Sequence, residues 1–196
     1  MAIPFVGLTG GIGSGKSTAL EELERLGAAT LSTDRVVHDL YGDAEVRDAV
    51  VDRFGEQVAP DGTVDRGAVA EAAFATAEER AWLEGLLWPR VGARMVAWRE
   101  ALDRQSPPPR AAVVEVPLLF ESGMEAAFDA TIAVVADEQL REERAGSRGH
   151  QALAERGARQ LSQQEKAQRA TYVAVNDGSV EELAAKLSGI LEMLAR

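Results

Sequence analysis

Short apolar runs alternate along this chain with longer stretches in which apolar residues recur at helical spacing. Five runs are candidate buried strands, at residues 3–9, 28–32, 111–121, 130–136 and 171–175. Strands that alternate with helices form a mostly parallel sheet with right-handed crossovers. The pattern therefore predicts an α/β fold with a five-stranded, parallel, doubly wound sheet.

The stretches between these runs differ in length. Residues 16–26 predict one helix that ends at Gly27. Residues 34–104 are helical in pattern, interrupted by "APDGTVDRG", and are too long for a single crossover. Residues 139–168 are charged and helical in character, and the last helix carries a core-facing apolar stripe that ends at Leu194. We therefore expect a substrate-binding region inserted between the second and third strands.

Composition narrows the function classes. A net charge of −11 argues against a nucleic-acid partner, because a phosphate backbone requires a basic face. Without cysteine the chain has no disulfide, thiolate metal site or cysteine nucleophile. The N-terminal sequence shows no secretory signal, and no apolar run approaches about 18 residues, the length that spans a membrane. We expect a cytoplasmic protein with no membrane partner.

The segment "GGIGSGKS", residues 10–17, matches the phosphate-loop pattern G-x-x-x-x-G-K-[ST] at every fixed position. It lies between a predicted strand and a predicted helix. Glycines let backbone N–H groups turn inward around phosphate oxygens, and the helix N-terminus directs its positive dipole end at the same anion. Lys16 is expected to reach the β- and γ-phosphates, and the Ser17 hydroxyl to ligate Mg²⁺. The segment predicts binding of a nucleoside triphosphate.

Asp34 follows the second predicted strand. Ligands of doubly wound sheets gather beyond the carboxyl ends of strands, so this carboxylate can face the phosphate loop and orient an acceptor hydroxyl as a general base. Asp34 is equally a candidate N-cap for a helix that begins near Arg35, and both roles can hold together. A GTPase is disfavoured, because the D-x-x-G match at residues 39–42 falls in helical sequence and no N-K-x-D segment occurs.

The chain resembles dephospho-CoA kinases over essentially its whole length. Six segments follow that family's order and spacing: "VGLTGGIGSGKST", "LGAATLSTD", "APDGTVDRGAV", "VVEVPLLFESG", "QLREER…ERGARQ" and "TYVAVNDGS". The resemblance implies an adenylate-kinase-like P-loop NTPase with a helical lid. It also implies transfer of the γ-phosphoryl group of ATP to the 3′-hydroxyl of the dephospho-CoA ribose, the last step of CoA synthesis.

The resemblance implies an organisation into three regions. Residues 1–34, 111–139 and 170–196 would form the nucleotide-binding core. Residues 35–110 would form the helical CoA-binding region, and residues 140–169 the lid. The oligomeric state is not predicted.

The resemblance also implies roles for individual residues. ATP would be bound by Gly11, Gly13, Ser14, Gly15, Lys16, Ser17 and Thr18, with Asn176 and Gly178 near the adenine. Asp34 matches the second aspartate of the family's D-x-D segment, its proposed general base. Arg66 matches the arginine of "DG-x-x-x-R" and Glu121 the glutamate of "PLL-x-E", both expected near the substrate. The alternatives are a surface ion pair between Arg66 and a neighbouring aspartate, and ordinary turn chemistry at residues 176–178.

Arginines of the predicted lid would stabilise the transferring group while closure excludes water. Four arginines fall in that region: Arg141, Arg144, Arg148 and Arg156. Arg144 is the first candidate for a catalytic role, and Arg156 is a second, on the substrate side. The alternative is a solvated helix whose arginines pair with Glu142, Glu143 and Glu155.

Two positions depart from the family pattern. Ser32 replaces the first aspartate of D-x-D, so that Mg²⁺ would depend on Ser17, water and ATP oxygens. Trp88 replaces the histidine of "HP-x-V" and can fill its space but cannot exchange a proton. Two rival functions stay open: another small-molecule kinase of the same architecture, and a non-catalytic regulator that binds CoA or ATP.

Overall fold

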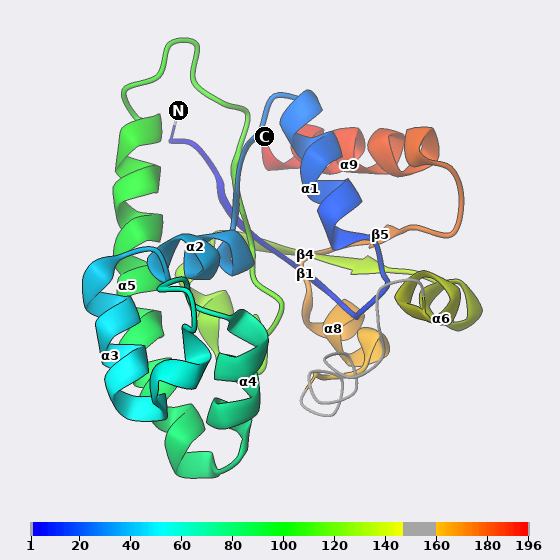
Figure 1. Ribbon diagram of the computed structural model, residues 1–196. Helices are drawn as coiled ribbons and strands as arrows, with labels where there is room; N and C mark the ends of the chain where they lie inside the picture. The colour runs from blue at the N-terminus through cyan, green and yellow to red at the C-terminus, as the bar shows by residue number, and fades with distance from the viewer. Residues whose placement is uncertain (1, 147–159, 196) are drawn as a thin grey trace. The chain divides into compact units, whose positions relative to one another are not determined.

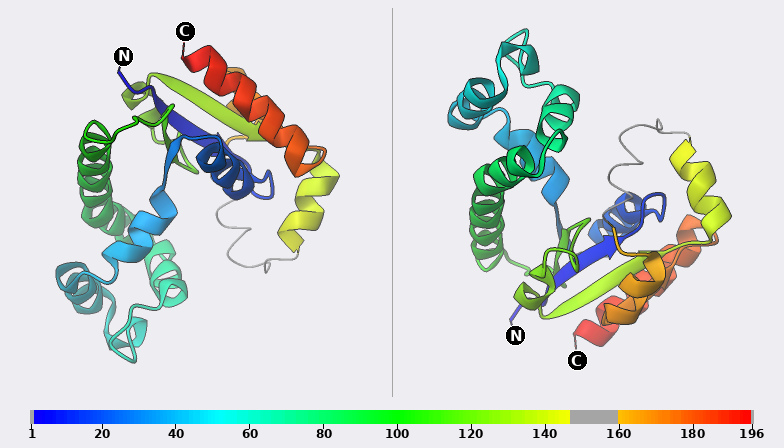
Figure 2. Two further views of the ribbon diagram at one scale, coloured as in Figure 1. Left: turned by 90° about the horizontal axis from the view of Figure 1, so that it is seen from above. Right: turned by 90° about the horizontal axis from the view of Figure 1, so that it is seen from below.

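The structure is a computed structural model that describes residues 2–146 and 160–195, with side chains at all of these except 145 and 146. The chain divides into two compact units (Figures 1 and 2). The first comprises Met1–Ser32 and Ala101–Arg196, and the second comprises Thr33–Glu100. Each unit is described here by itself.

The first unit is built on five strands that pair only in parallel. They are β1 (Phe5–Gly10), β2 (Ala29–Ser32), β3 (Ala112–Glu115), β4 (Ala130–Val135) and β5 (Tyr172–Val175). Their order across the sheet is β2-β3-β1-β4-β5. The predicted five-stranded parallel sheet is confirmed, and β1 occupies its centre.

Four described helices accompany this sheet: α1 (Lys16–Arg25), α6 (Glu138–Gly146), α8 (Gln163–Arg169) and α9 (Val180–Leu194). A 3₁₀ turn, η2 (Met124–Ala127), precedes β4. Helices α1 and α9 cover one face of the sheet and α8 lies on the other (Figure 1). Because helices cover both faces, β1 and β4 are apolar along almost their whole length, as the sequence pattern indicates.

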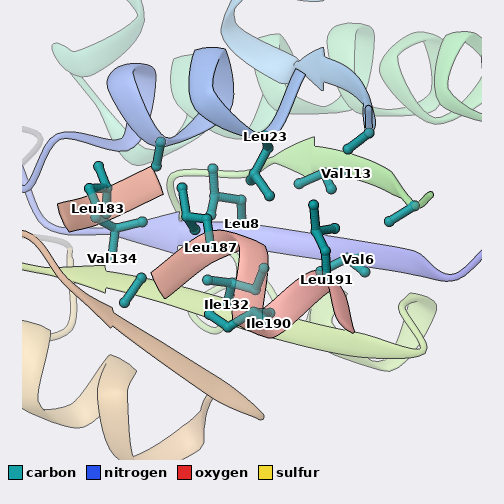
Figure 3. Packing of buried hydrophobic residues seen from close by; sticks show 14 residues of the cluster. Val6, Leu8, Leu23, Val113, Ile132, Val134, Leu183, Leu187, Ile190 and Leu191 are labelled. Atoms are coloured by element: carbon teal, nitrogen blue, oxygen red, sulfur yellow. The ribbon is translucent and has the colours of Figure 1, made fainter. Parts of the chain in front are cut away.

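The core of the first unit lies between the sheet and the pair α1 and α9 (Figure 3). Val6 and Leu8 point to this side from β1, since alternate residues of a strand share a face. The apolar stripe predicted for the last helix is present, and its members Leu183, Leu187 and Leu191 are at most 1% exposed. The stripe therefore anchors the C-terminal helix to the sheet.

Replacing Leu187 by alanine is expected to lower the free energy of unfolding by about 2–5 kcal/mol, because it opens a cavity at a fully buried site. Urea denaturation measures this change. Met193→Ala on the same helix is the control, since the Met193 side chain is 46% exposed. Equal losses in the two variants would contradict the burial assignment.

The second unit is helical, as predicted for the stretch after the second strand. Its elements are α2 (Thr33–Leu40), α3 (Ala44–Phe54), the 3₁₀ turn η1 (Glu56–Val58), α4 (Arg66–Phe74) and α5 (Ala77–Leu102), which continues two residues into the first unit. Its buried residues include Val46, Val50, Val58 and Val69, each at most 1% exposed. Residues 59–65 of the predicted interruption "APDGTVDRG" lie between η1 and α4, and its last two residues begin α4.

Candidate active site

The phosphate loop leaves the carboxyl end of β1 and enters α1 at Lys16. Two of its glycines have left-handed backbones, with φ of +76° at Gly13 and +90° at Gly15. A Cβ at Gly15 would lie 2.1 Å from Nδ2 of Asn176, and one at Gly13 would lie 2.4 Å from the carbonyl oxygen of Arg141. Both the backbone conformation and the close neighbours therefore require glycine at these positions.

The loop presents polar groups suited to an anion. The Lys16 Nζ lies 3.0 Å from the carbonyl oxygen of Gly11, to which it donates a hydrogen bond. Ser14 is fully buried, and its Oγ has no hydrogen-bond partner within the part of the chain that the structure describes. Helix α1 has neither a side-chain cap nor an acidic residue in its first turn, so its positive dipole end is not neutralised there. Ser17, in the same turn, is exposed.

Asn176, which follows β5, supports the phosphate loop through hydrogen bonds. Its side-chain amide Nδ2 donates to the carbonyl oxygen of Ser14 over 2.9 Å, and its backbone N–H donates to Val135 over 2.8 Å. The Asn176 carbonyl oxygen accepts a hydrogen bond from Nη1 of Arg144 at 3.2 Å. The structure thus brings Asn176 and Arg144 together at the phosphate loop. Gly178 lies nearby in sequence, where a Cβ would meet the Glu182 carboxylate that caps α9.

Replacing Asn176 by aspartate is expected to raise the KM for ATP about 5- to 100-fold, because it sets a carboxylate oxygen against the Ser14 carbonyl at a buried position. Steady-state kinetics at saturating acceptor measure this. Asp177→Asn is the matched control, since its side-chain oxygen can still accept the hydrogen bond from the Asp137 N–H. An unchanged KM in Asn176→Asp would show that this hydrogen bond does not shape the loop.

Helix α6 packs an arginine against the phosphate loop. The Arg141 Nε donates to the carbonyl oxygen of Ile12 over 2.9 Å, and its Nη1 forms an ion pair with Glu138 at 2.6 Å. Arg141 therefore contacts the phosphate loop and pairs with Glu138. Arg148 and Arg156, which the sequence also singles out, lie outside the described residues.

A hollow of about 430 Å³ opens beside the loop. Gly11, Ile12 and Arg141 line one part of it, and residues 160–164 line another. The hollow lies wholly within the first unit.

Glu121 forms a buried ion pair that sequence reasoning missed. Its Oε1 lies 2.9 Å from Nζ of Lys166, which is on α8 and is fully buried. Burial lowers the pKa of the Lys166 ammonium, and the hydrogen bond and charge of Glu121 oppose that shift. Glu121 Oε2 is also buried and has no hydrogen-bond partner in the described ranges. No local signal in "SQQEKAQRA" distinguishes this lysine from an exposed one.

The two predicted acceptor-side residues belong to the second unit. Asp34 is exposed in the first turn of α2. The helix begins at Thr33, so Asp34 is not the N-cap that the sequence also allowed. Arg66 is the exposed first residue of α4.

The neighbouring aspartates do not engage Arg66. Asp65 caps α4 by accepting hydrogen bonds from the N–H groups of Gly67 and Ala68. Over the ranges 2–146 and 160–195, Arg66 forms no ion pair with Asp61 or Asp65. The alternative prediction, a surface ion pair between Arg66 and a neighbouring aspartate, is therefore wrong.

The two departures from the family pattern occupy different environments. Ser32 ends β2 half-buried, and its register partner on β3 is the buried Glu115. Trp88 lies on α5 with 55% of its surface exposed, so it does not fill a buried space within its own unit. Glu115 places a carboxylate at the carboxyl edge of the sheet, on the strand that pairs directly with β1. The signal for it in the sequence is a single acidic residue within an apolar strand.

The family model for dephospho-CoA kinase matches residues 4–182. The chain belongs to the dephospho-CoA kinase family. The dephospho-CoA kinase of Chromobacterium violaceum is 40% identical to it over 93% of this chain and 90% of that protein. That of Deinococcus radiodurans is 38% identical over 96% and 91%. The crystal structure of TT1252 from Thermus thermophilus has a TM-score of 0.79 and 32% identity, covering 99% of each chain.

Membership settles the reaction class that the sequence predicted. This dephospho-CoA kinase is a P-loop transferase that uses ATP as phosphoryl donor and catalyses the final step of CoA biosynthesis. Dephospho-CoA is its small-molecule substrate. Among the described helices none combines the length and apolarity needed to cross a membrane.

Proposed function

We propose that the phosphate loop, Asp34 and the arginines of α6 together carry out transfer of the γ-phosphoryl group to the ribose 3′-hydroxyl of dephospho-CoA. The observation that carries this proposal is the loop itself. An uncapped helix N-terminus, a buried Ser14 hydroxyl and Lys16 meet at one turn. Such a turn binds the phosphates of ATP, because backbone N–H groups, helix dipole and ammonium charge all favour an anion there.

Within the loop, Gly11, Gly13 and Gly15 allow the backbone to approach the phosphates closely. Lys16 would leave the Gly11 carbonyl and bridge the β- and γ-phosphate oxygens, neutralising charge that grows as the bond to the leaving group breaks. Thr18, the third residue of α1, would donate a further hydrogen bond to the phosphates. Asn176 and Gly178 would form the wall nearest the adenine.

Mg²⁺ is the metal that this site fits best. The exposed Ser17 hydroxyl would be one oxygen ligand, since Mg²⁺ commonly takes only one or two protein ligands beside waters and phosphate oxygens. In the part of the chain that the structure describes, no cluster of three or more histidine, aspartate or glutamate side chains could hold a metal by itself. Bound at Ser17, Mg²⁺ would supply charge neutralisation on the β- and γ-phosphates.

On the acceptor side, Asp34 would accept or orient the proton of the 3′-hydroxyl for in-line attack. Its exposure leaves the carboxylate accessible to a substrate hydroxyl. Arg66, exposed and unpaired with either neighbouring aspartate, would contact the anionic part of dephospho-CoA. Glu121, whose Oε2 is buried, would act on the substrate side through its contacts with Lys166 and Leu161. Arg144 and Arg156 would stabilise charge on the transferring group and at the substrate.

The test is an ADP-release assay with and without dephospho-CoA, in the presence of MgATP. We expect ADP release to depend on the acceptor, with one phosphate appearing on the ribose 3′-oxygen by ³¹P NMR. Absence of acceptor-dependent release would overturn the proposal.

A further inference from the structure

Two separate segments of the first unit, β1 and residues 117–121, meet at the ammonium group of Lys166. Its Nζ donates to the Pro117 carbonyl oxygen over 2.7 Å, to Glu121 Oε1 over 2.9 Å and to Thr9 Oγ1 over 3.3 Å. The Thr9 hydroxyl itself lies 3.3 Å from the same Pro117 oxygen and donates to it. The three protons of the ammonium are thus matched by three acceptors.

These acceptors sit next to the parts of the site that bind ATP. Thr9 immediately precedes Gly10, where the phosphate loop begins, and Thr9 is fully buried. Glu121 Oε1 also accepts a hydrogen bond from the Leu161 N–H at 2.8 Å. Leu161 lines the hollow beside the loop, together with Gly11 and Ile12. Lys166 therefore connects the entrance of the loop to residues that line the adjoining hollow.

Stability alone gives little reason for an ion pair at this place. Burying an ammonium group carries a desolvation cost, and apolar side chains of similar volume often replace buried ion pairs without loss of stability. Lys166 is 0% exposed and Glu121 has a side-chain exposure of 13%. An ammonium group does what an apolar side chain cannot, since it fixes three oxygens from two segments of the chain at hydrogen-bonding distance.

We propose that Lys166 is a positioning residue for phosphoryl transfer, acting through Thr9 on the phosphate loop and through Glu121 on Leu161. The proposal rests on the function proposed above and adds a residue to it. Lys166 does not touch the reacting atoms. It sets the geometry in which the loop and the neighbouring wall receive ATP.

The experiment compares Lys166→Met with Lys186→Met in the full chain. The chain has three lysines, and Lys186 is the exposed one outside the phosphate loop, bonded to a backbone oxygen of Val175. A misplacement of reacting groups by 1 Å can cost on the order of 10²-fold in rate. We expect Lys166→Met to shift the phosphate loop by less than this, and therefore to lower kcat by about tenfold. ATP binding, measured by calorimetry, should weaken severalfold, and Lys186→Met should match the wild type.

A purely structural role would give a different result. Lys166→Met would then lower the thermal midpoint and the folded fraction, but kcat per folded molecule and the Kd for ATP would equal those of the wild type. That outcome, or an equal loss of kcat in Lys186→Met, would overturn the proposal. The folded fraction is measured by circular dichroism under the assay conditions.

Thr9→Val probes the same contacts without creating an unpaired buried charge, and it carries the test should Lys166→Met not fold. It removes the hydroxyl that joins Lys166 to the loop entrance. We expect kcat to fall about fivefold, the rate equivalent of one hydrogen bond. Unchanged kcat and ATP affinity in Thr9→Val would overturn the proposal. If the wild type itself released no ADP with dephospho-CoA, the proposed function would fail, and the ATP affinities of these variants would still decide the role of Lys166.

Discussion

Asp34→Asn is expected to lower kcat by about 10²- to 10⁴-fold, the usual contribution of a positioned general base. Asparagine keeps the size of the side chain but cannot accept the proton of the 3′-hydroxyl. ATP binding should stay near the wild-type value, because the phosphate loop is unchanged. Single-turnover kinetics with dephospho-CoA, combined with calorimetry for ATP, measure both quantities.

Asp39→Asn is the matched control for this variant. Asp39 is also an exposed aspartate of α2, five residues further along the helix, and the same substitution there should leave kcat unchanged. Thermal unfolding establishes that both variants are folded. A near-normal kcat in folded Asp34→Asn would show that another group receives the proton, and the D-x-D correspondence would then not carry the role of base to this chain.

Lys16→Met is expected to reduce kcat by about 10²- to 10³-fold, comparable to the loss of one preorganised donor to developing charge. The methionine side chain has similar length but no charge for the β- and γ-phosphates. KM for ATP should rise as well, because the ammonium group also attracts the ground-state phosphates. Fold stability should change little, since Lys16 is only half-buried.

Lys186→Met serves again as the control, because it removes the same charge from an exposed position of α9. A parallel titration with salt separates specific contacts from general charge effects, since screening weakens only long-range attraction between exposed charges. If Lys16→Met lost activity no more than Lys186→Met, the assignment of Lys16 to the phosphates would be wrong.

Local patterns predicted the elements of the first unit because each one depends on neighbouring residues. The apolar runs that became β1 and β4 are buried on both faces, so nearly every residue in them is apolar. The stripe of α9 is read directly from helical spacing. The glycines of the phosphate loop are likewise local, since left-handed φ angles at Gly13 and Gly15 follow from a residue type that tolerates them.

The candidate site was harder to predict where its residues interact across the sheet. The hydrogen bond from Asn176 to the Ser14 carbonyl joins positions 162 residues apart, and turn chemistry explained the same Asn-Asp-Gly segment equally well without it. Lys166 belongs to a short polar helix whose sequence resembles any solvated helix. Its burial arises from where α8 lies on the sheet, which no local pattern records.

The sequence by itself determined the parallel α/β class, the phosphate loop and the kinase family, because these depend on local residue types in a fixed order. Only the tertiary structure decided the strand order β2-β3-β1-β4-β5, the support of the loop by Asn176 and Arg144, and the burial of Lys166 against Thr9, Pro117 and Glu121. The physical reason is that hydrogen bonds and ion pairs form between whatever groups the fold brings within about 3 Å, regardless of their separation along the chain.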